Sequence, residues 1–298
     1  MLKWAGGKRQ LLPELRKFYP TAFDTYWEPF LGSGAVFFDL HARGALDGRG
    51  VMLSDHNADL IACYRAVRDC PEQVIGELSR LATGHARDGA RHYYEVRNER
   101  FNPQRAALAA APDREFEYTP ALAAMFVYLN RTGYNGLFRL NSDGEFNVPA
   151  GSYAKPKICD EPNVRRVARA LARPGLTLER ARFERIVERA GAGDFLYFDP
   201  PYAPLSKTSR FTSYTAEGFG ADDQKRLRDL LVTLVRRGCQ VLMSNSTAPE
   251  IAALYEDDEG AASAGLRCYR IPARRAINSN RLRRGTVDEY VITNVRGL

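Results

Sequence analysis

Histidine and cysteine are scarce in this sequence, and their arrangement matches no common metal or disulfide framework. There are four histidines among 298 residues, with no metal-ligand spacing among them, so we expect no metal site. The five cysteines are odd in number and scattered, without a Cys-x-x-Cys pair. This pattern indicates free thiols in a reducing compartment rather than disulfides.

Long apolar runs are also missing. No stretch approaches the ~20 apolar residues that a membrane span requires. The first ten residues, MLKWAGGKRQ, lack the apolar centre of a signal peptide. We therefore expect a cytoplasmic protein that does not contact a membrane. Hydrophobic residues make up 45% of the chain and charged residues 27%, proportions typical of a globular protein with a sizeable core.

Acidic residues are the minority among the charges, with 36 Asp and Glu against 43 Lys and Arg and a net charge of +7. This excess is a modest indication of a polyanionic partner. It is concentrated in residues 267–285, RCYRIPARRAINSNRLRRG, which contain seven arginines and no acid. The segment is either an exposed arginine-rich loop or a surface that contacts phosphates, and its one-sided charge favours phosphate contacts.

The order of the elements predicts an α/β fold that is interrupted once. Strands are expected at 26–27 and 50–55, separated by a glycine-containing turn and a helix, and Asn57 is expected to cap a further helix. After residue 160 the alternation of strands and helices resumes. The later predicted strands are 176–181, 194–198, 239–245 and 288–295, with a long amphipathic helix at 222–238.

The middle of the chain has a different character. From about residue 70 to 160 the pattern is mainly helical and then irregular. The irregular part, TGYNGLFRLNSDGEFNVPAGSYAKPK at 132–157, is rich in Gly, Asn and Pro but also carries aromatic and basic residues. An unstructured segment of this length is uncommon unless it is functional. We therefore predict one domain from residues 1–60 and 160–298, and an inserted second domain at 61–159.

A glycine-containing turn follows the first predicted strand. In EPFLGSGAVFF, Gly32 and Gly34 allow the backbone to approach a ligand, although tight turns without ligands are as common. Phe37 occupies the place of the third glycine in a dinucleotide fingerprint, and no Walker sequence is present, so NAD and ATP are disfavoured. Asp55 ends the second strand and either caps a helix or accepts ribose hydroxyls. Together, the turn and Asp55 favour an adenosine derivative without a pyrophosphate.

The tetrapeptide DPPY at 199–202 is the most specific motif. Asp199 ends a predicted strand, where ligands bind in open α/β sheets. The prolines fix the backbone and lack N–H donors, while their carbonyls remain acceptors. A carboxylate and a rigid carbonyl suit a planar amine with two N–H donors, and Tyr202 can stack on the ring that bears the amine. A proline-rich turn without a ligand is the alternative.

Five motifs occur in a fixed order: KWAGGK at 3–8, EPFLGSGAVF, SDHNADLI, LNRTGYNGLFRLNSDGEFNVPAGSY and DPPYAPLS. In content and order they resemble the motifs of the Dam-type, alpha-group DNA adenine-N6 methyltransferases. The resemblance covers nearly the whole chain and implies a site-specific DNA adenine-N6 methyltransferase. It also implies an α/β fold, a Rossmann-like class I methyltransferase sheet with an inserted, mainly helical target-recognition domain. The hairpin loop of that domain would span about 132–153.

The resemblance also implies the cofactor, S-adenosyl-L-methionine, which leaves as S-adenosyl-L-homocysteine. Asp199 and the Pro200 carbonyl are expected to hold the N6 amino group of a flipped adenine, with Tyr202 stacked on the base. The amine then attacks the cofactor methyl group directly. Some relatives carry an acid before the aromatic residue at position 183, where this chain has Arg182. The implied cofactor-binding residues are Trp4, Ala5, Lys8, Phe30, Gly32, Gly34, Asp55, Phe183 and Asp199.

The partner that the resemblance implies is double-stranded DNA containing GATC, bound by a monomeric enzyme. Arg139 matches the arginine that reads a guanine edge. Tyr134 and Asn135 match the pair that inserts where the adenine has left. We expect a protein of the bacterial nucleoid, or one encoded by a phage. The sequence leaves four biological roles open: repair marking, gene regulation, restriction-modification and phage protection. The remaining implied DNA contacts are Leu137, Pro149 and Tyr153 on bases, and Lys3, Arg131, Asn280, Arg281 and Arg284 elsewhere on the DNA.

Other interpretations of the same motifs remain. A cytosine-N4 DNA methyltransferase performs the same attack but usually carries Ser in place of Asp199. Protein-glutamine and ribosomal RNA methyltransferases usually carry Asn there and lack the insert. A catalytically silent, DNA-binding relative would be expected to lose the acid or the cofactor glycines, whereas Gly32, Gly34, Asp55 and Asp199 are present. We therefore favour adenine N6 and keep cytosine N4 and a silent relative as the alternatives.

Overall fold

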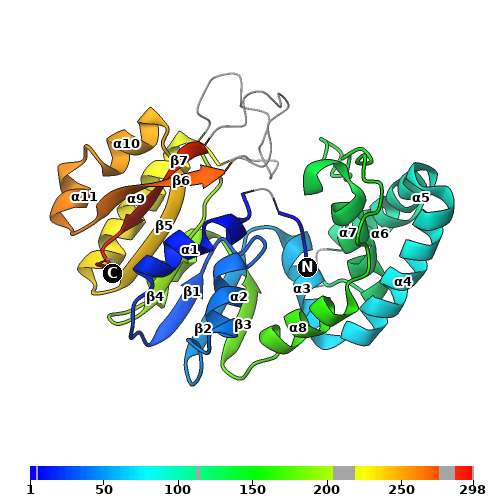
Figure 1. Ribbon diagram of the computed structural model, residues 1–298, viewed down its shortest axis with the longest axis horizontal. Coiled ribbons are helices and arrows are strands. Elements are labelled where there is room, and N and C mark those ends of the chain that lie inside the picture. Colours follow the sequence, from blue (N-terminus) through cyan, green and yellow to red (C-terminus); the bar gives the residue numbers. More distant parts are fainter. Residues whose placement is uncertain (5, 112–114, 204–218, 275–285, 297–298) are drawn as a thin grey trace. The chain divides into compact units, whose positions relative to one another are not determined.

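The computed structural model describes residues 1–4, 6–111, 115–203, 219–274 and 286–296. Figure 1 shows their helices and strands, coloured along the chain. Within them the chain divides into two compact units. The first consists of Met1–Gly7 and Asn57–Arg180, and the second of Lys8–His56 with the described residues from Ala181 onward.

The second unit contains most of the sheet and the helices that cover it. Its strands are β1 (Thr25–Glu28), β2 (Gly50–Asp55), β4 (Phe195–Phe198), β5 (Gln240–Ser246), β6 (Arg267–Arg274) and β7 (Thr286–Thr293). Its longer helices are α2 (Ala35–Ala42) and α9 (Ala221–Arg236). The short helices are η1 (Lys8–Gln10), α1 (Leu12–Leu15), η2 (Arg16–Phe18), η5 (Phe183–Glu188), α10 (Pro249–Tyr255) and α11 (Glu259–Ser263).

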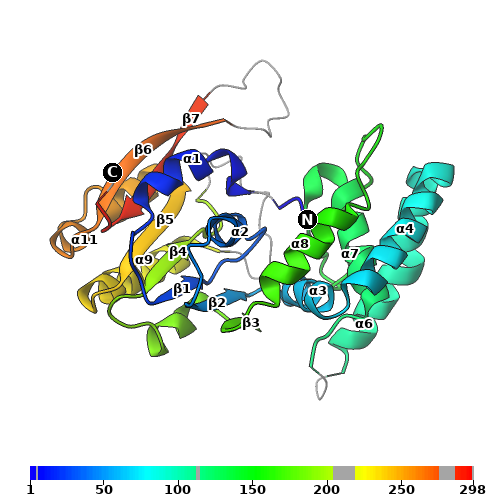
Figure 2. The ribbon, with the colours of Figure 1, turned by 60° about the horizontal axis from the view of Figure 1, so that its bottom comes forward.

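The sheet has seven strands in the order β3-β2-β1-β4-β5-β7-β6, where β3 is Leu176–Arg180. Neighbouring strands from β2 to β5 are parallel, and β7 is antiparallel to both β5 and β6. The chain order reverses between β1 and β4. From this point, the connection from β1 to β2 and the connection from β4 to β5 run in opposite directions along the sheet. Because such crossovers are right-handed, their helices α2 and α9 lie on opposite faces of the sheet (Figure 2). This arrangement confirms the predicted α/β fold with a Rossmann-like class I methyltransferase sheet.

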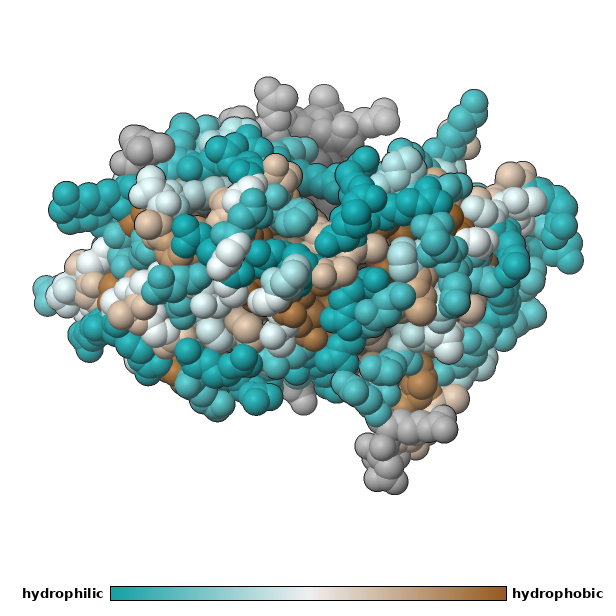
Figure 3. All heavy atoms as spheres, turned by 90° about the horizontal axis from the view of Figure 1, so that it is seen from below, coloured by the Kyte–Doolittle hydropathy of each residue, from teal (hydrophilic) through white to brown (hydrophobic). Residues whose placement is uncertain are grey.

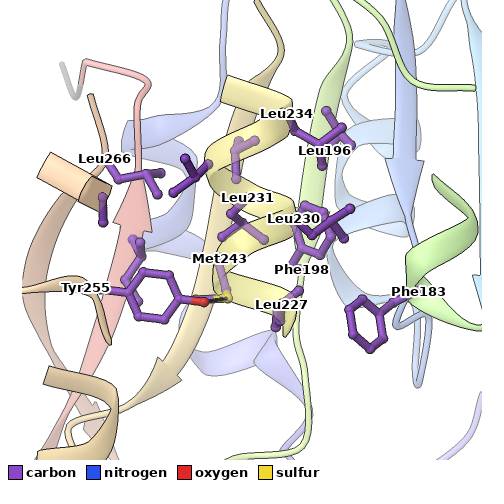
Figure 4. Packing of buried hydrophobic residues seen from close by; sticks show 14 of the residues in the cluster. Phe183, Leu196, Phe198, Leu227, Leu230, Leu231, Leu234, Met243, Tyr255 and Leu266 are labelled. Atoms are coloured by element: carbon purple, nitrogen blue, oxygen red, sulfur yellow. Dashed lines mark hydrogen bonds between the residues drawn. The ribbon is translucent and has the colours of Figure 1, made fainter. Parts of the chain in front are cut away.

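The core of the second unit lies between α9 and the sheet. Four leucines of α9 stand at positions i, i+3, i+4 and i+7, so they project from one face of the helix. They pack in a cluster with Phe198 of β4 and Met243 of β5 (Figure 4). Each such buried side chain contributes about 1.5–3 kcal/mol through the hydrophobic effect. The four leucines are Leu227, Leu230, Leu231 and Leu234.

The first unit is mainly helical, as expected for the insert. Its central helix, α7 (Pro120–Thr132), is buried along most of its length. The Thr119 hydroxyl caps α7, and the Asn57 Oδ1 caps α3 by accepting the Leu60 N–H at 3.0 Å. The other elements are α3 (Ala58–Asp69), α4 (Pro71–Asp88), α5 (Ala90–Glu95), the π-helical η3 (Val96–Phe101), α6 (Asn102–Ala109), η4 (Tyr134–Gly136) and α8 (Glu161–Leu171).

The interpretation of the whole arginine-rich segment as a loop is wrong. Residues 267–274 form β6, which pairs antiparallel with β7 along its full length. Ile271 is buried, while Arg270 is exposed and pairs with Glu256 at 2.8 Å. Pairing with β7 satisfies the main-chain groups, and the arginine side chain keeps its charge in water. Residues 275–285 lie outside the described part of the chain.

One face of the molecule is largely polar. Hydrophilic side chains cover most of the face shown in Figure 3, and hydrophobic residues form small areas between them. Tyr94 and Tyr134 are large aromatic side chains that lie exposed. Among the described residues, none of the helices combines the length and the apolar character that crossing a membrane requires.

Candidate active site

The turn after β1 allows close approach of a ligand to the backbone. Gly32 and Gly34 have φ angles of 47° and 65°, in the left-handed region that favours glycine. The Gly34 N–H donates to the Leu31 carbonyl at 2.6 Å. A Cβ atom at Gly34 would lie 2.9 Å from the Phe38 ring, so this tight turn has no room for a side chain there.

Asp55 lies beside this turn. Its Oδ2 accepts a hydrogen bond from the Gly32 N–H at 3.0 Å, between the ends of the paired strands β1 and β2. The structure thus brings together two residues that the sequence predicts for one cofactor. The cap of α3 is Asn57, so the alternative role of Asp55 as a helix cap is wrong.

An aromatic pair stands near the same strand ends. The rings of Phe30 and Phe183 are stacked, with centroids 5.4 Å apart and an interplanar angle of 26°. The ring of Phe30 also lies 6.5 Å from that of Phe198 in β4. Arg182 pairs with Glu184 at 3.5 Å, and Phe183 beside it remains buried. The pair offers flat apolar surface of the kind that packs against a planar heterocycle.

Asp199 follows β4 and pairs with a buried lysine. The Lys8 Nζ lies 2.8 Å from the Asp199 Oδ1, and Lys8 is 3% exposed. The same ammonium group lies 4.3 Å from the centroid of the Tyr202 ring. The sequence predicts Lys8 for the cofactor but does not reveal this pairing, because the two residues are far apart in the chain.

Side chains from two other elements hold the loop that follows Asp199. The Tyr202 hydroxyl donates to the Glu289 Oε2 of β7 at 2.5 Å. The Gln224 Nε2 of α9 donates to the Pro201 carbonyl at 3.0 Å. These contacts hold the ring of Tyr202 and the backbone at Pro201.

The carbonyl groups of Pro200 and Ala203 differ in whether they accept a hydrogen bond. The Ala203 carbonyl accepts a hydrogen bond from the Ser246 hydroxyl of β5 at 2.9 Å. The Pro200 carbonyl accepts none from any residue that the structure describes, so its lone pairs remain available. The sequence alone does not single out Ser246, Gln224 or Glu289; polar residues inside buried elements are the one signal that points to the first two.

Burial shifts the pKa values of two acids at these strand ends. It raises the pKa of Asp199 to about 6, although the Lys8 ammonium opposes the rise. It also raises the pKa of Glu28, the last residue of β1, to about 8. The Tyr26 hydroxyl and the Phe37 N–H donate to the Glu28 Oε2 at 2.7 and 3.0 Å. At neutral pH Asp199 is therefore mainly an ionised acceptor, whereas Glu28 is mainly protonated.

In the first unit, the N-terminal residues pack against the segment 132–153, which we call the hairpin. The Trp4 ring is stacked 6.3 Å from that of Phe138. The Lys3 Nζ lies 3.6 Å from the centroid of the Tyr153 ring and donates to the Arg131 carbonyl at 3.2 Å. Three residues predicted to contact DNA are thus close together.

Side chains of the hairpin alternate between core and surface. Phe138 and Val148 are buried, whereas Arg139 and Pro149, which follow them directly, are exposed. The Arg139 Nε donates to the Asn147 Oδ1 at 2.8 Å, which orients the guanidinium group. The outer face of the hairpin therefore presents residues that the sequence predicts for base contacts.

Tyr134 and Asn135 stand at the start of the hairpin. Tyr134 is 50% exposed, so its ring is accessible to a ligand. Asn135 has a φ angle of 54°, the left-handed conformation that costs energy in residues other than glycine. Backbone strain of this kind is concentrated at functional sites.

The family model of the D12 class N6 adenine-specific DNA methyltransferases matches residues 4–271. The chain belongs to this family. It is therefore an enzyme, an adenine-specific DNA methyltransferase, and the family implies DNA as its substrate and an S-adenosylmethionine-type cofactor. The preference for adenine over cytosine, inferred from Asp199, agrees with this family.

Individual relatives of this methyltransferase match it over almost their whole length. The type II methyltransferase M1.LlaDCHI of Lactococcus lactis subsp. cremoris is 38% identical over 292 residues, which cover 98% of this chain and 94% of that protein. The type II methyltransferase M.MjaIII of Methanocaldococcus jannaschii is 38% identical, with 93% and 92% covered. The DNA adenine methylase of Escherichia coli K12 is 34% identical, with 97% and 93% covered.

Most of the predicted site residues of the methyltransferase lie in one of the two compact units, and four lie outside the residues that the structure describes. Among the residues described, no group of three or more His, Cys, Asp and Glu side chains could hold a metal ion. Ala5, Asn280, Arg281 and Arg284 lie outside the described ranges. The second unit holds Lys8, Phe30, Gly32, Gly34, Asp55, Phe183, Asp199, Pro200 and Tyr202, and the first holds Lys3, Trp4, Arg131, Tyr134, Asn135, Leu137, Arg139, Pro149 and Tyr153.

Proposed function

We propose that this methyltransferase transfers the methyl group of S-adenosyl-L-methionine to adenine N6 in double-stranded DNA, within GATC sites. The observation that carries the proposal is the pair of acceptors at the end of β4. The ionised Asp199 is held by Lys8, and the neighbouring Pro200 carbonyl has no donor among the described residues. Two fixed acceptors match the two hydrogens of one exocyclic amine.

The residues near β1 and β2 fit the cofactor. The Asp55 carboxylate can accept hydrogen bonds from ribose hydroxyls, and Phe30 with Phe183 provides surface for an adenine ring. The turn at Gly32 and Gly34 lets the backbone approach the methionine end. When bound, the cofactor supplies an electrophilic methyl group on its sulfonium, and S-adenosyl-L-homocysteine is the product that leaves.

Asp199 and Pro200 prepare the attacking nitrogen. The carboxylate accepts one N6 hydrogen and the Pro200 carbonyl accepts the other, which favours a tetrahedral nitrogen with an available lone pair. With the cofactor bound, that lone pair would form the bond to the methyl carbon as the methyl–sulfur bond breaks, without a covalent enzyme intermediate, and the methylated nitrogen would then release one proton. Tyr202 stacks on the adenine, and Glu289 keeps its ring in place through the hydroxyl. Lys8 holds Asp199 in its ionised form.

The adenine must leave the duplex, because its N6 atom is otherwise paired and cannot meet the methyl group. Tyr134 and Asn135 insert into the duplex where the adenine has left, and the exposure of Tyr134 supports this role. Arg139 reads a guanine of GATC through its guanidinium fork. We assign target recognition to the domain 61–159 and catalysis to 1–60 with 160–298. The remaining proposed DNA contacts are Leu137, Pro149 and Tyr153 on bases, and Lys3, Arg131, Asn280, Arg281 and Arg284.

The setting follows from the relatives. Bacterial and phage proteins among them carry the names DNA adenine methylase and DNA N-6-adenine-methyltransferase, and others are named type II methyltransferases. We therefore propose an enzyme that acts as a monomer on DNA in the bacterial cytoplasm. The type II names support a role in restriction-modification.

The proposal is tested with tritiated S-adenosyl-L-methionine and two duplexes that differ only in carrying GATC or a scrambled site. We expect label on the GATC duplex alone. Label on neither duplex would exclude the activity, and equal label on both would exclude GATC as the target. Asp199→Ala should abolish labelling while DNA binding persists. The matched control is Asp229→Ala, which removes an exposed acid of α9 and should label like the wild type.

A further inference from the structure

Main-chain contacts join the two arms of the hairpin at its base and near its tip. Isolated bridges join Gly133 to Ala150 and Leu140 to Phe146. Main-chain N–H groups donate across the arms from Tyr134 to Pro149, Gly151 to Thr132, Asn147 to Arg139 and Asn141 to Glu145, at 2.8–3.1 Å. No continuous strand ladder connects the base to the tip, so contacts from outside the hairpin add to the control of its register.

Asn102, the first residue of α6, provides such support. Its Oδ1 accepts the Phe146 N–H at 3.0 Å, and its Nδ2 donates to the Phe146 carbonyl at 3.1 Å. Both main-chain groups of one hairpin residue are therefore satisfied by one side-chain amide, as a neighbouring strand would satisfy them. Asn102 is buried, so water cannot replace these bonds without the hairpin moving away.

Arg105, one turn further along α6, holds the tip of the hairpin. Its Nη1 donates to the Gly144 carbonyl at 2.6 Å. Its Nε and Nη2 donate to both carboxylate oxygens of Asp59 at 2.6 and 2.9 Å, and the Tyr118 hydroxyl also donates to Asp59. The guanidinium group thus has a fixed orientation, set by a buried acid, before it reaches the hairpin.

A second pair of donors reaches the hairpin from α5 and η3, the two elements that precede α6. The Tyr93 hydroxyl and the Arg97 Nη1 each donate to the Val148 carbonyl at 2.9 Å. The donors at 93, 97, 102 and 105 belong to three consecutive helical elements. The π-helical turn of η3 accommodates the five-residue step from 97 to 102 and keeps all four donors on the hairpin side.

These contacts determine which hairpin side chains face outward. Phe146 and Val148 are held toward the helices. Because successive side chains of an extended segment point to opposite sides, Asn147 and Pro149 point away from the helices. Asn147 in turn receives the Nε of Arg139. A slip of the return arm by one residue would turn Asn147 inward and remove the partner that orients Arg139.

We propose that Asn102 is a positioning residue for sequence specificity, acting through Phe146 and Asn147 on the orientation of Arg139. This inference rests on the proposed function, in which Arg139 reads a guanine of GATC. Arg105 and Tyr93 support the same register at the tip and at Val148. None of these three residues needs to touch DNA for the effect.

The test compares Asn102→Ala with Asn163→Ala, which removes an amide on α8 that has no hydrogen bond to the hairpin. Methyl transfer is measured on a GATC duplex and on duplexes with one guanine replaced. Asn102→Ala should lose about tenfold in discrimination at the guanine that Arg139 reads. The loss should appear in KM, with kcat at saturating DNA unchanged. Asn163→Ala should match the wild type.

Two further measurements keep the result interpretable. Amide hydrogen exchange of peptides spanning 146–149 should be faster in Asn102→Ala and unchanged in Asn163→Ala. Tyr93→Phe keeps the buried ring, removes only one donor to Val148, and should shift discrimination in the same direction by less. This milder variant guards against a loss of folding in Asn102→Ala.

The outcomes separate the two claims. A wild type that methylates neither duplex overturns the proposed function, and the inference falls with it. A wild type that discriminates while Asn102→Ala and Tyr93→Phe retain full discrimination and wild-type exchange overturns the inference alone. Loss of kcat with unchanged discrimination also overturns it, because that would place Asn102 in catalysis or general stability.

Discussion

Asp199 and Glu28 stand at the ends of neighbouring strands, and burial raises the pKa of each, to about 6 and about 8. They differ because the Lys8 ammonium lies 2.8 Å from Asp199, whereas Glu28 receives hydrogen bonds from a neutral hydroxyl and a backbone N–H. The partly buried Asp199 therefore keeps its charge near neutral pH, and the buried Glu28 keeps its proton.

The state of Asp199 predicts a pH dependence of catalysis. Methyl transfer should fall as the pH drops through about 6, because a protonated Asp199 no longer holds the amine as an ionised acceptor. Lys8→Met removes the charge that opposes protonation, so the fall should begin at a higher pH. Single-turnover rates from pH 5 to 8.5, at saturating cofactor and DNA, measure both. Lys17→Met, at an exposed lysine, is the control; coincident profiles for all three proteins would contradict the role of Lys8.

The raised pKa of Glu28 predicts that the stability of the protein depends on pH. Its folded pKa of about 8 lies above the ordinary value of 4.5, so the folded chain keeps a proton that the unfolded chain releases. Its contribution to stability is complete below pH 4.5 and is lost as the pH rises toward 8, by at most about 1.4 kcal/mol per pH unit. Glu28→Gln keeps an acceptor and does not titrate.

The free energy of urea unfolding of Glu28→Gln, minus that of the wild type, should therefore increase between pH 5 and pH 8. A difference that does not change with pH would show that Glu28 is ionised in the folded protein. The comparison between two proteins at each pH cancels the titration of all other groups.

Single residues could be predicted from the sequence where a short motif carries them. Asp199 and Tyr202 belong to one tetrapeptide, and Asp55 ends a recognisable strand. Glu289 could not be predicted, because a glutamate near the start of a strand resembles any solvent-facing residue. Only the placement of β7 brings it to the Tyr202 hydroxyl.

At the scale of elements, local signals predicted helix starts and missed features that depend on distant contacts. Asn57 caps α3 within one turn, so the sequence alone reveals it. β6 went unrecognised because its arginines resemble a loop and its stability comes from pairing with β7. The π-helical η3 has no signal in the sequence, and its reason lies in the contacts that α5 and α6 make with the hairpin.

The place of Arg139 on the hairpin predicts a loss of sequence specificity when its guanidinium group is removed. Arg139→Ala should weaken discrimination at a single guanine of the target by about 1–3 kcal/mol, because one bidentate base contact is lost. Ratios of kcat/KM for GATC and for duplexes with one guanine replaced measure this. Arg169→Ala, at an exposed arginine of α8, is the control. Equal losses at every position of the target would instead assign Arg139 to a phosphate.

At the scale of the whole molecule, the alternation of strands and helices predicted the α/β sheet and its single interruption. The order of the strands, with β7 between β5 and β6, could not be derived from it, because pairing across the sheet leaves no local pattern. The sheet order explains why the glycine turn after β1 and DPPY after β4 belong to one site. They follow the two strands that flank the point where the chain order reverses.

The most direct test of the account is the chemical identity of the methylated base. A GATC duplex is incubated with the enzyme and cofactor, digested to nucleosides, and separated by liquid chromatography with mass detection. We expect N6-methyldeoxyadenosine as the methylated nucleoside, and none of it with Asp199→Ala. N4-methyldeoxycytidine, or N6-methyldeoxyadenosine formed equally well by Asp199→Ala, would contradict the assignment of Asp199 and Pro200 as the acceptors that hold adenine N6.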